Sequence, residues 1–341
     1  MLQLPGTGKP NRSRSAIFGL GLLVAGISAP ALGQGPPDRS PELAVGQPWQ
    51  TGQMASDLVN ESSGLAASRI HPRAYWTHND NGRVPGLFLI RADGQHLGTV
   101  HLEGAGFTDW EAVATVHRKG RNLVVVGDMG DNRARRDDCR LFVFEEPQIP
   151  LQADSPPRIV IDDFQTIEFR YPDGPQDCEA MAVQPDGRRI WLVSKQRPGG
   201  AGATNSAGRN GNLEHTAIHW LDWPDAAGDP LMANRLDSRF DTLLVTGLDF
   251  SPDNRLAVIR TYFNLYLFER QGDETWQERM TRAADLQHGV PLQRQGEAVA
   301  FAPDSRQILL TSEGFSQPIW RLPLNVPESG EGDPPLPDPR R

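Results

Sequence analysis

The amino-acid sequence predicts an all-β fold, a five-bladed β-propeller of four-stranded antiparallel blades. Three observations predict it. A short pattern occurs five times, beginning at Glu61, Asp109, Asp177, Leu244 and Gln295. Runs of β-branched, aromatic and apolar residues follow every copy, as buried strands require, and three copies continue into a Pro-Asp-x-Arg turn. The copies lie about 50 to 70 residues apart, a period that suits blades of four strands.

The five copies predict the innermost strand of each blade. They read ESSGLAAS, DWEAVATV, DCEAMAVQ, LVTGLDFS and QGEAVAFA. The predicted second strands are AYWTHND, NLVVVGDMG, RIWLVSKQ, RLAVIRTY and QILLTSEG. The predicted third strands are GLFLIRAD, CRLFVFEEP, HTAIHWLDW, NLYLFERQ and QPIWRLPL. Between the first and second strands, proline sets φ at the first corner and aspartate bonds back to the backbone, so Pro-Asp-x-Arg predicts tight hairpins.

Fourth strands are predicted by segments such as LGTVHLE, TIEFRY and FDTLLV, but the chain degenerates after the fifth copy. We expect residues 49–59 to supply the missing strand, because that closes the ring and removes an open sheet edge. No helical periodicity is evident, which disfavours α/β and helical folds. A sandwich of two sheets is the alternative, although its strands would not recur in fours.

The chain outside the repeats predicts an exported protein. Residues 1–33 have the features of a cleaved signal peptide: basic residues, a short apolar run and small residues before Gln34. An uncleaved anchor is the alternative. We expect residues 34–48 and 326–341 to be disordered, residues 49–325 to form the propeller, and residues 198–212 to form an inserted loop. The expected location is secreted or periplasmic.

Composition limits the partners. The formal charge is −9, and removal of Lys9, Arg12 and Arg14 with the signal peptide makes it −9 − 3 = −12. An acidic surface argues against nucleic acid and anionic lipid as partners. No later segment has the length of a membrane span. We expect a monomer that binds a small anionic or sugar-like ligand.

Two cysteines, Cys139 and Cys178, occur in the chain. An oxidising compartment permits one disulfide between them, but sequence does not give the Cα separation that decides it. Without CxxC spacing the pair gives no support to a zinc site.

One column of the repeat predicts a metal site. Its members carry side-chain oxygen and precede Gly or Ala: Ser63, Glu111, Glu179, Thr246 and Glu297. Three carboxylates brought together around an axis repel one another unless a cation offsets the charge. Ca²⁺ accepts six to eight oxygen ligands in an adaptable shell, so we expect Ca²⁺. A water-filled polar channel is the alternative.

The ends of the second strands lie at the same end of each blade as the starts of the innermost strands. They predict a ligand site lined by Asn79, Asn81, Asp131, Asn132, Lys195 and Arg260. The candidate catalytic residues there are Asp80 and Asp128, which would orient water, and His78, a candidate general base. Turn chemistry is the alternative for the Asn-rich loops, and a satisfied loop histidine is the alternative for His78. No GxSxG, P-loop, GxGxxG or HExxH motif occurs.

The motifs ESSGLA, HNDNG, DWEAVA, GDMGDN and DCEAMA, between Glu61 and Ala182, resemble a mostly uncharacterised family of secreted bacterial propeller proteins. More distantly, the order of Ser and Glu around the ring is similar to that of the calcium-activated apyrases, five-bladed propellers that hydrolyse nucleoside di- and triphosphates. That resemblance implies an axial Ca²⁺ held by the five-residue column, with Asp80 matching a catalytic-site acid. HNDNG lacks the arginine that follows the acids in the apyrase loop.

Two hypotheses for function remain open from the sequence. The first is a metal-dependent hydrolase of small phosphorylated or otherwise anionic esters, phytase-like or apyrase-like. The second is a non-catalytic propeller that binds a glycan or a protein and holds Ca²⁺ for stability. Fold class does not choose between them, because propellers support both.

Overall fold

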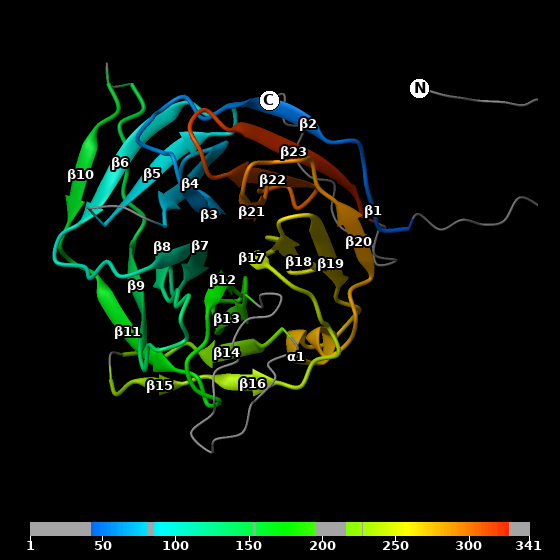
Figure 1. Ribbon diagram of the computed structural model, residues 1–341. Coiled ribbons are helices and arrows are strands. Elements are labelled where there is room, and N and C mark those ends of the chain that lie inside the picture. The colour runs from blue at the N-terminus through cyan, green and yellow to red at the C-terminus, as the bar shows by residue number, and fades with distance from the viewer. Residues whose placement is uncertain (1–41, 81–84, 153–154, 196–215, 227, 327–341) are drawn as a thin grey trace, which may run out of the picture. The chain divides into compact units, whose positions relative to one another are not determined.

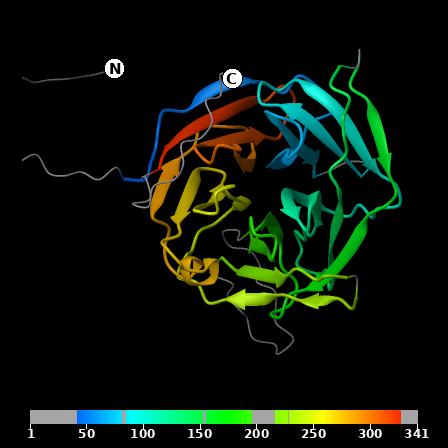
Figure 2. The same ribbon diagram turned by 180° about the vertical axis from the view of Figure 1, so that it is seen from behind.

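The computed structural model describes residues 42–80, 85–152, 155–195, 216–226 and 228–326. Residues 1–33, predicted to be a signal peptide, Asn81, residues 198–212, predicted to form a loop, and residues 327–341 lie outside these ranges. Within the unit Ser40–Arg341, five separate β-sheets stand around a common axis (Figures 1 and 2). The predicted five-bladed β-propeller is therefore confirmed.

Each blade is an antiparallel meander with its innermost strand nearest the axis (Figure 1). Blade 1 contains β3 (Ser62–Ala67), β4 (Ala74–Asn79), β5 (Gly86–Arg91) and β6 (His96–Leu102). Blade 2 contains β7 (Trp110–Arg118), β8 (Arg121–Asp128), β9 (Cys139–Glu145) and β11 (Gln165–Arg170). Blade 3 contains β12 (Cys178–Val183), β13 (Arg189–Ser194), β14 (Ile218–Asp222) and β16 (Asn234–Leu236). Blade 4 contains β17 (Val245–Phe250), β18 (Leu256–Thr261), β19 (Asn264–Glu269) and β20 (Leu286–Gly289).

Blade 5 combines both ends of the described chain. Its strands are β21 (Gly296–Phe301), β22 (Gln307–Ser312), β23 (Pro318–Asn325) and β2 (Trp49–Gln53), the last of which pairs antiparallel with β23. The expected closure by the segment after residue 48 is thus confirmed, with the strand confined to residues 49–53. A further two-residue strand, β1 (Ala44–Val45), also pairs with β23, inside the segment for which the sequence predicts disorder.

Closure depends on Gly52, because a Cβ atom there would lie 1.9 Å from the carbonyl oxygen of Asp93. A backbone atom in a neighbouring blade has little room to move aside. We therefore predict that Gly52→Ala lowers the free energy of unfolding by about 1 to 3 kcal/mol, in the range of overpacked sites. Urea unfolding measures this. Gly228→Ala is the matched control, since a Cβ at Gly228 meets no atom within 4 Å; equal stability of both variants would refute the prediction.

The structure adds elements that periodicity did not reveal. Strand β10 (Arg158–Ile161) extends blade 1 parallel to β6, and β15 (Leu231–Met232) extends blade 2 parallel to β11. A five-residue helix, α1 (Trp276–Met280), precedes β20; it is too short to leave a helical pattern in the sequence. The prediction that FDTLLV is a fourth strand was wrong. Strand β16 pairs with β14 instead, and Phe240 packs in the core while Val245 begins β17.

The hydrophobic core consists of layers between neighbouring blades. Trp76 and Leu89 of blade 1 meet Trp110 and Phe142 of blade 2, for example, and equivalent clusters fill the other four junctions. Because each blade buries both faces, its central strands are almost continuously apolar. The chain therefore holds its axial strands by side-chain packing, with no backbone hydrogen bonds required between innermost strands.

The Pro-Asp-x-Arg hairpins form as predicted. In each, the aspartate Oδ1 accepts the backbone N–H of the arginine: Asp186 from Arg188 at 2.9 Å, Asp253 from Arg255 at 3.1 Å and Asp304 from Arg306 at 2.9 Å. The residue between them has positive φ in all three turns. Over the described ranges, no helix has both the length and the apolar character needed to cross a bilayer.

Candidate functional site

A β-bulge in the innermost strand of every blade creates the polar axis. The pairing register shifts between Ser62 and Gly64 and at the equivalent point in β7, β12 and β17, and in β21 the shift lies between Gly296 and Val299. The residues at these shifts are Ser63, Glu111, Glu179, Thr246 and Glu297, which we call the bulge ring. All five are buried. A bulge re-aims a side chain out of the sheet, so the metal column predicted from the sequence is brought together by a repeated backbone irregularity.

A second ring lies beside the bulge ring. The residue directly after each second strand is Asp80, Met129, Lys195, Tyr262 or Glu313, which we call the strand-end ring. The backbone holds four of these five in the same way. The N–H groups of Asp80, Met129, Lys195 and Glu313 donate to the carbonyls of Glu61, Asp109, Asp177 and Gln295, each two residues before a bulge-ring residue.

Lys195 provides a positive charge inside this site. Its Nζ lies 3.0 Å from Glu179 Oε2 and 3.7 Å from Glu297 Oε1, and all three side chains are buried. The ammonium also lies over the Tyr262 ring, whose hydroxyl donates to Glu297 Oε1 at 3.2 Å. Burial alone would lower the pKa of Lys195, but Glu179 and Glu297 outweigh it and raise that pKa. The sequence predicted a metal ion because the carboxylates of this column repel one another. The Lys195 ammonium offsets part of that repulsion.

The carboxyls of Asp80, Glu297 and Glu313 form a separate group. One oxygen of each lies within 4.8 Å of the others, and this is the one such group of three acidic, histidine or cysteine side chains in the described ranges. Glu313 Oε1 is buried and has no hydrogen-bond partner among the described residues. The hydroxyls of Ser63 and Thr246, in contrast, donate to Glu111 and to the Glu297 carbonyl. The acidic group therefore contains Glu297 from the bulge ring and Asp80 and Glu313 from the strand-end ring.

The carboxyls at this end of the axis hold their protons unusually tightly. Burial raises the pKa of Glu313 to about 9, with help from Glu297 and Asp80. Burial also raises the pKa of Glu179 to about 7, although Lys195 opposes the shift. The pKa of Glu111 is raised well above its ordinary value by burial and by the neighbouring Glu179, Asp109, Glu297 and Asp80. The carboxyls at this end of the axis outnumber the one ammonium of Lys195, so binding of protons or of a cation is favoured here.

These shifts predict how stability depends on pH in the presence of a chelator. A carboxyl whose pKa is higher in the folded state binds more protons folded than unfolded between the two values, so stability falls as pH rises through that window. For Glu179 the window extends to about pH 7, and for Glu313 to about pH 9. We expect the EDTA-treated protein to lose unfolding free energy from pH 5 to 9, measured by urea titration. Glu313→Gln should flatten the upper part of the curve; an unchanged slope would refute the assignment.

His78 lies within the inter-blade core. It is 0% exposed, its ring stands edge-on to Trp110, and its Nε2 faces Gly64, where a Cβ would come within 2.5 Å. Burial lowers the pKa of His78 to about 4, so the ring is neutral at physiological pH. The glycine of ESSGLA makes room for the ring, and Nε2 has no hydrogen-bond partner among the described residues. Its role as general base stays a prediction.

The GDMGDN loop of blade 2 is organised by its own acids. Asp128 is 0% exposed; its Oδ1 accepts from Arg136 at 3.0 Å and from the Asp109 backbone at 2.9 Å. Asp131 accepts from the backbone N–H of Arg136 at 2.6 Å, and its own N–H donates to Asp177. Asn132 is exposed at the surface of the loop. Asp128 is thus the last residue of β8, and the strand-end ring position of this blade is the next residue, Met129.

The other predicted ligand residues also contact the chain itself. Asn79 accepts from the Glu61 backbone at 3.1 Å and donates to the Leu58 carbonyl at 2.9 Å. Arg260 is fully buried and donates to the carbonyls of Ala298 and Thr311, joining blades 4 and 5. Burial lowers the pKa of Arg260 to about 9, against the opposing effect of Glu297. Asn81 lies outside the described residues.

Both cysteines are buried free thiols in the layer between blades 2 and 3. Burial raises the pKa of Cys139 to about 12, and the pKa of Cys178 is raised as well. Neither thiol therefore has thiolate character.

Glu313 is the site residue that the candidate metal set omitted, although its sequence position carries a signal. It follows the last residue of β22 as Asp80 follows the last residue of β4. The ends of the second strands place Glu313 at the same end of the blades as Asp80, but the candidate metal set was drawn from the innermost strands alone. The five strand-end residues are chemically unlike one another, so they do not stand out as one column.

Comparison with known proteins adds no family. No protein-family model matches the chain, and no curated protein matches it. Solved structures similar to it include the glutaminyl cyclase of Myxococcus xanthus, with a TM-score of 0.43 and 11% identity, covering 83% of this chain and 97% of that one. Another is the β-propeller domain of Cps50 (Swd1) from Myceliophteria thermophila, with a TM-score of 0.39 and 10% identity, covering 78% and 83% respectively. The fold assignment rests on the chain's own sheet topology.

Proposed function

We propose that the acidic end of the axis binds a hard divalent cation, Ca²⁺ in the first place, and that the protein is a metal-dependent hydrolase of small phosphorylated or otherwise anionic esters. The observation that carries the proposal is the group formed by Asp80, Glu297 and Glu313. Its oxygens lie within 4.8 Å of one another. Ligand oxygens on opposite sides of Ca²⁺ are about 4.6 to 5.2 Å apart, so one ion can contact all three carboxyls.

The chemistry of the donors fits such an ion. All three are carboxyls, which suits Ca²⁺, whereas zinc and copper favour His or Cys. Glu313 Oε1 has no hydrogen-bond partner among the described residues. Burial, and then the neighbouring carboxyls, raise the pKa of Glu313 and of Glu111, and a divalent cation would offset that neighbouring charge in place of protons.

The division of roles follows from the contacts. A bound cation would polarise a phosphoryl or acyl oxygen of the ligand. Three carboxyls supply only part of the six to eight oxygens that Ca²⁺ takes, which leaves positions for ligand and water. Asp80 is the candidate for orienting that water. Lys195, which lies at ion-pair distance from Glu179 and Glu297, holds the Glu297 carboxyl in place within the group.

The test is a turnover screen of nucleotides, sugar phosphates, phytate and lactones, with Ca²⁺ and with EDTA, alongside metal analysis of the purified protein. We expect turnover that EDTA abolishes. Asp80→Asn should abolish turnover while keeping the melting temperature that the wild type has in EDTA. Asp93→Asn, at a half-exposed acid of a distant hairpin, should leave turnover intact. Absence of turnover with every substrate would reject the catalytic part of the proposal.

A non-catalytic propeller that binds a glycan or protein, with structural Ca²⁺, is the second candidate. Three large apolar side chains at the same end of the blades favour it: Phe263 is 61% exposed, Leu292 91% and Phe315 58%. Such residues suit contact with a larger partner. In that case Ca²⁺ would raise the melting temperature, Glu297→Ala would remove the increase, and no substrate in the screen would turn over.

A further inference from the structure

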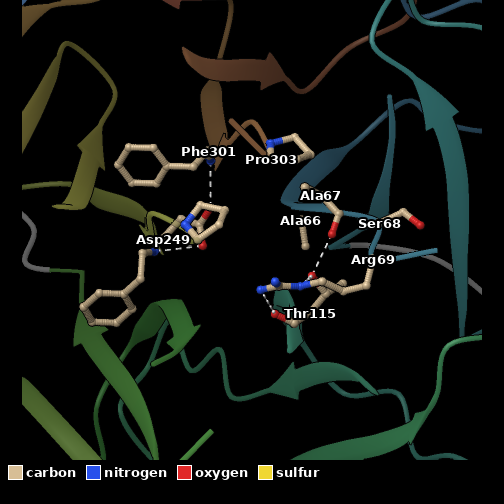
Figure 3. A pocket seen from close by; sticks show the side chains of 10 residues that line it. Ala66, Ala67, Ser68, Arg69, Thr115, Asp249, Phe301 and Pro303 are labelled. Atoms are coloured by element: carbon tan, nitrogen blue, oxygen red, sulfur yellow. Dashed lines mark hydrogen bonds between the residues drawn. The ribbon is translucent and has the colours of Figure 1, made fainter. Parts of the chain in front are cut away.

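A second pocket lies at the opposite ends of the innermost strands from the two acidic rings, and nothing in the proposed function uses it (Figure 3). Its volume is about 220 Å³, below the roughly 300 to 1,000 Å³ of pockets for drug-sized ligands, which suits a smaller molecule. Blades 1, 2, 4 and 5 contribute to it. Its apolar lining comprises Ala66, Ala67, Phe250, Pro252, Phe301 and Pro303.

One wall of the pocket carries a positive charge. The Arg69 Nε donates to Thr115 Oγ1 at 3.3 Å, and its Nη2 donates to the Thr115 carbonyl at 3.2 Å. Thr115 is itself fixed by a 2.6 Å hydrogen bond to the Ala67 carbonyl. A guanidinium has five N–H donors, and the Arg69 side chain donates to no described residue other than Thr115. Its remaining donors are available to a ligand.

The facing wall carries a negative charge. The Asp249 Oδ1 accepts from the Phe250 backbone at 2.9 Å, and its Oδ2 accepts from the Phe301 backbone at 2.7 Å. These two bonds fix the carboxyl and leave about two of its four acceptor positions. The guanidinium end of Arg69 points toward the side on which Asp249 lies (Figure 3). Each group favours the charged form of the other, but no ion pair joins these two described residues.

The repeat shows that the fold does not require a carboxyl at this position. Asp249 is the sixth residue of its copy, and the sixth residue of the other four copies is alanine: Ala66, Ala114, Ala182 and Ala300. An acid in a partly buried position costs desolvation, and burial raises the pKa of Asp249 to about 7. A cationic group of a ligand would offset that cost.

We propose that this pocket binds a small zwitterion with an apolar body, of the chemical class of a free apolar amino acid. The ligand carboxylate would pair with Arg69, its ammonium with Asp249, and its side chain would contact Phe250 and Phe301. Charge complementarity selects this class over a simple anion, because Asp249 would repel an anion, and over a simple cation, because Arg69 would repel a cation.

Isothermal titration of the full chain tests the proposal with three ligands that share the leucine side chain and differ in their charged groups: L-leucine has both charges, N-acetyl-L-leucine lacks the ammonium and carries an acetyl group, and L-leucinamide lacks the carboxylate. We expect leucine to bind about tenfold or more tightly than either blocked form, since each lost charge removes one charge-assisted contact. No binding of leucine or phenylalanine at about 10 mM, or equal binding of leucine and a blocked form, would overturn the proposal.

Variants at Arg69 and Asp249 test the two charged contacts with the ligand separately. Arg69→Gln should weaken leucine and N-acetyl-leucine and spare leucinamide, whereas Asp249→Ala should weaken leucine and leucinamide and spare N-acetyl-leucine. Asp249→Ala also loses two backbone hydrogen bonds, so its melting temperature is measured first; Arg69 is exposed, and its variant keeps the test valid if the other unfolds. Glu313→Gln, at the far end of the axis, should bind leucine unchanged. A loss there equal to that of Arg69→Gln would contradict a separate site.

Discussion

Glu313→Gln is expected to reduce Ca²⁺ affinity by at least about 100-fold, because it removes one of three carboxyls that converge within 4.8 Å. Isothermal titration with CaCl₂ after EDTA treatment measures the loss directly. Melting temperature gives a second readout: Ca²⁺ at 100 times its dissociation constant stabilises a folded protein by about 2.7 kcal/mol. The variant should lose that increase at the same concentration.

Glu61→Gln is the matched control. The Glu61 backbone forms a bridge with Glu313, but its carboxyl is not a member of the group of three. It should keep wild-type affinity, which separates loss of a ligand from a local change of charge. Wild-type protein that binds no Ca²⁺, or a Glu313→Gln variant that binds it as tightly as the wild type, would contradict the site.

Lys195→Met is expected to lower the free energy of unfolding by about 3 to 5 kcal/mol at pH 7.5, the cost of leaving buried carboxylates without their partner. Lys195 and Glu179 are 5% and 4% exposed, so water cannot replace the ammonium. The loss should shrink at pH 5, because burial raises the pKa of Glu179 to about 7 even with Lys195 present, and the protonated carboxyl needs no counter-charge. Urea unfolding at the two pH values measures both effects.

Lys119→Met provides the comparison, since Lys119 pairs with Asp225 at the surface, where the side chains are 56% and 76% exposed. Its stability should be essentially unchanged at both pH values. A Lys195→Met variant as stable as Lys119→Met, or one with the same loss at pH 5 and 7.5, would show that the buried pair does not carry the charge balance proposed here.

Together these variants separate two ways of balancing charge at one end of the axis. Lys195 offsets Glu179 and part of Glu297 as a covalently attached cation. Glu313 has a buried oxygen, Oε1, with no hydrogen-bond partner among the described residues, and its carboxyl lies close to those of Asp80 and Glu297. We expect Ca²⁺ to bind on the side of the ring that Lys195 does not reach.

The sequence predicted the fold well because its signals are local. The Pro-Asp-x-Arg turns depend on proline geometry and on an aspartate bond two residues ahead, and all three form. Strand periodicity located the first three strands of every blade. It failed for FDTLLV and for β10 and β15, because outer strands are short and partly exposed, and their pairing depends on which neighbouring edge is available.

The site was predicted only in part. The repeat alignment identified the bulge ring, because the five residues share one column and one backbone irregularity. It did not reveal that Lys195 lies between Glu179 and Glu297, or that Glu313 joins Asp80. Those contacts cross from one blade to another, and the register between blades is set by side-chain packing, which no local pattern records.

By itself the sequence determined the number of blades, the hairpin turns, the closing strand and the polar column, since each follows from short-range backbone preferences repeated five times. Only the tertiary structure decided which acids meet, which charge Lys195 offsets, that His78 and Asp128 lie in packed interiors, and that Arg69 faces Asp249 at the other end. The physical reason is that the energy of a charge depends on its neighbours and its burial, and both are properties of the assembled ring.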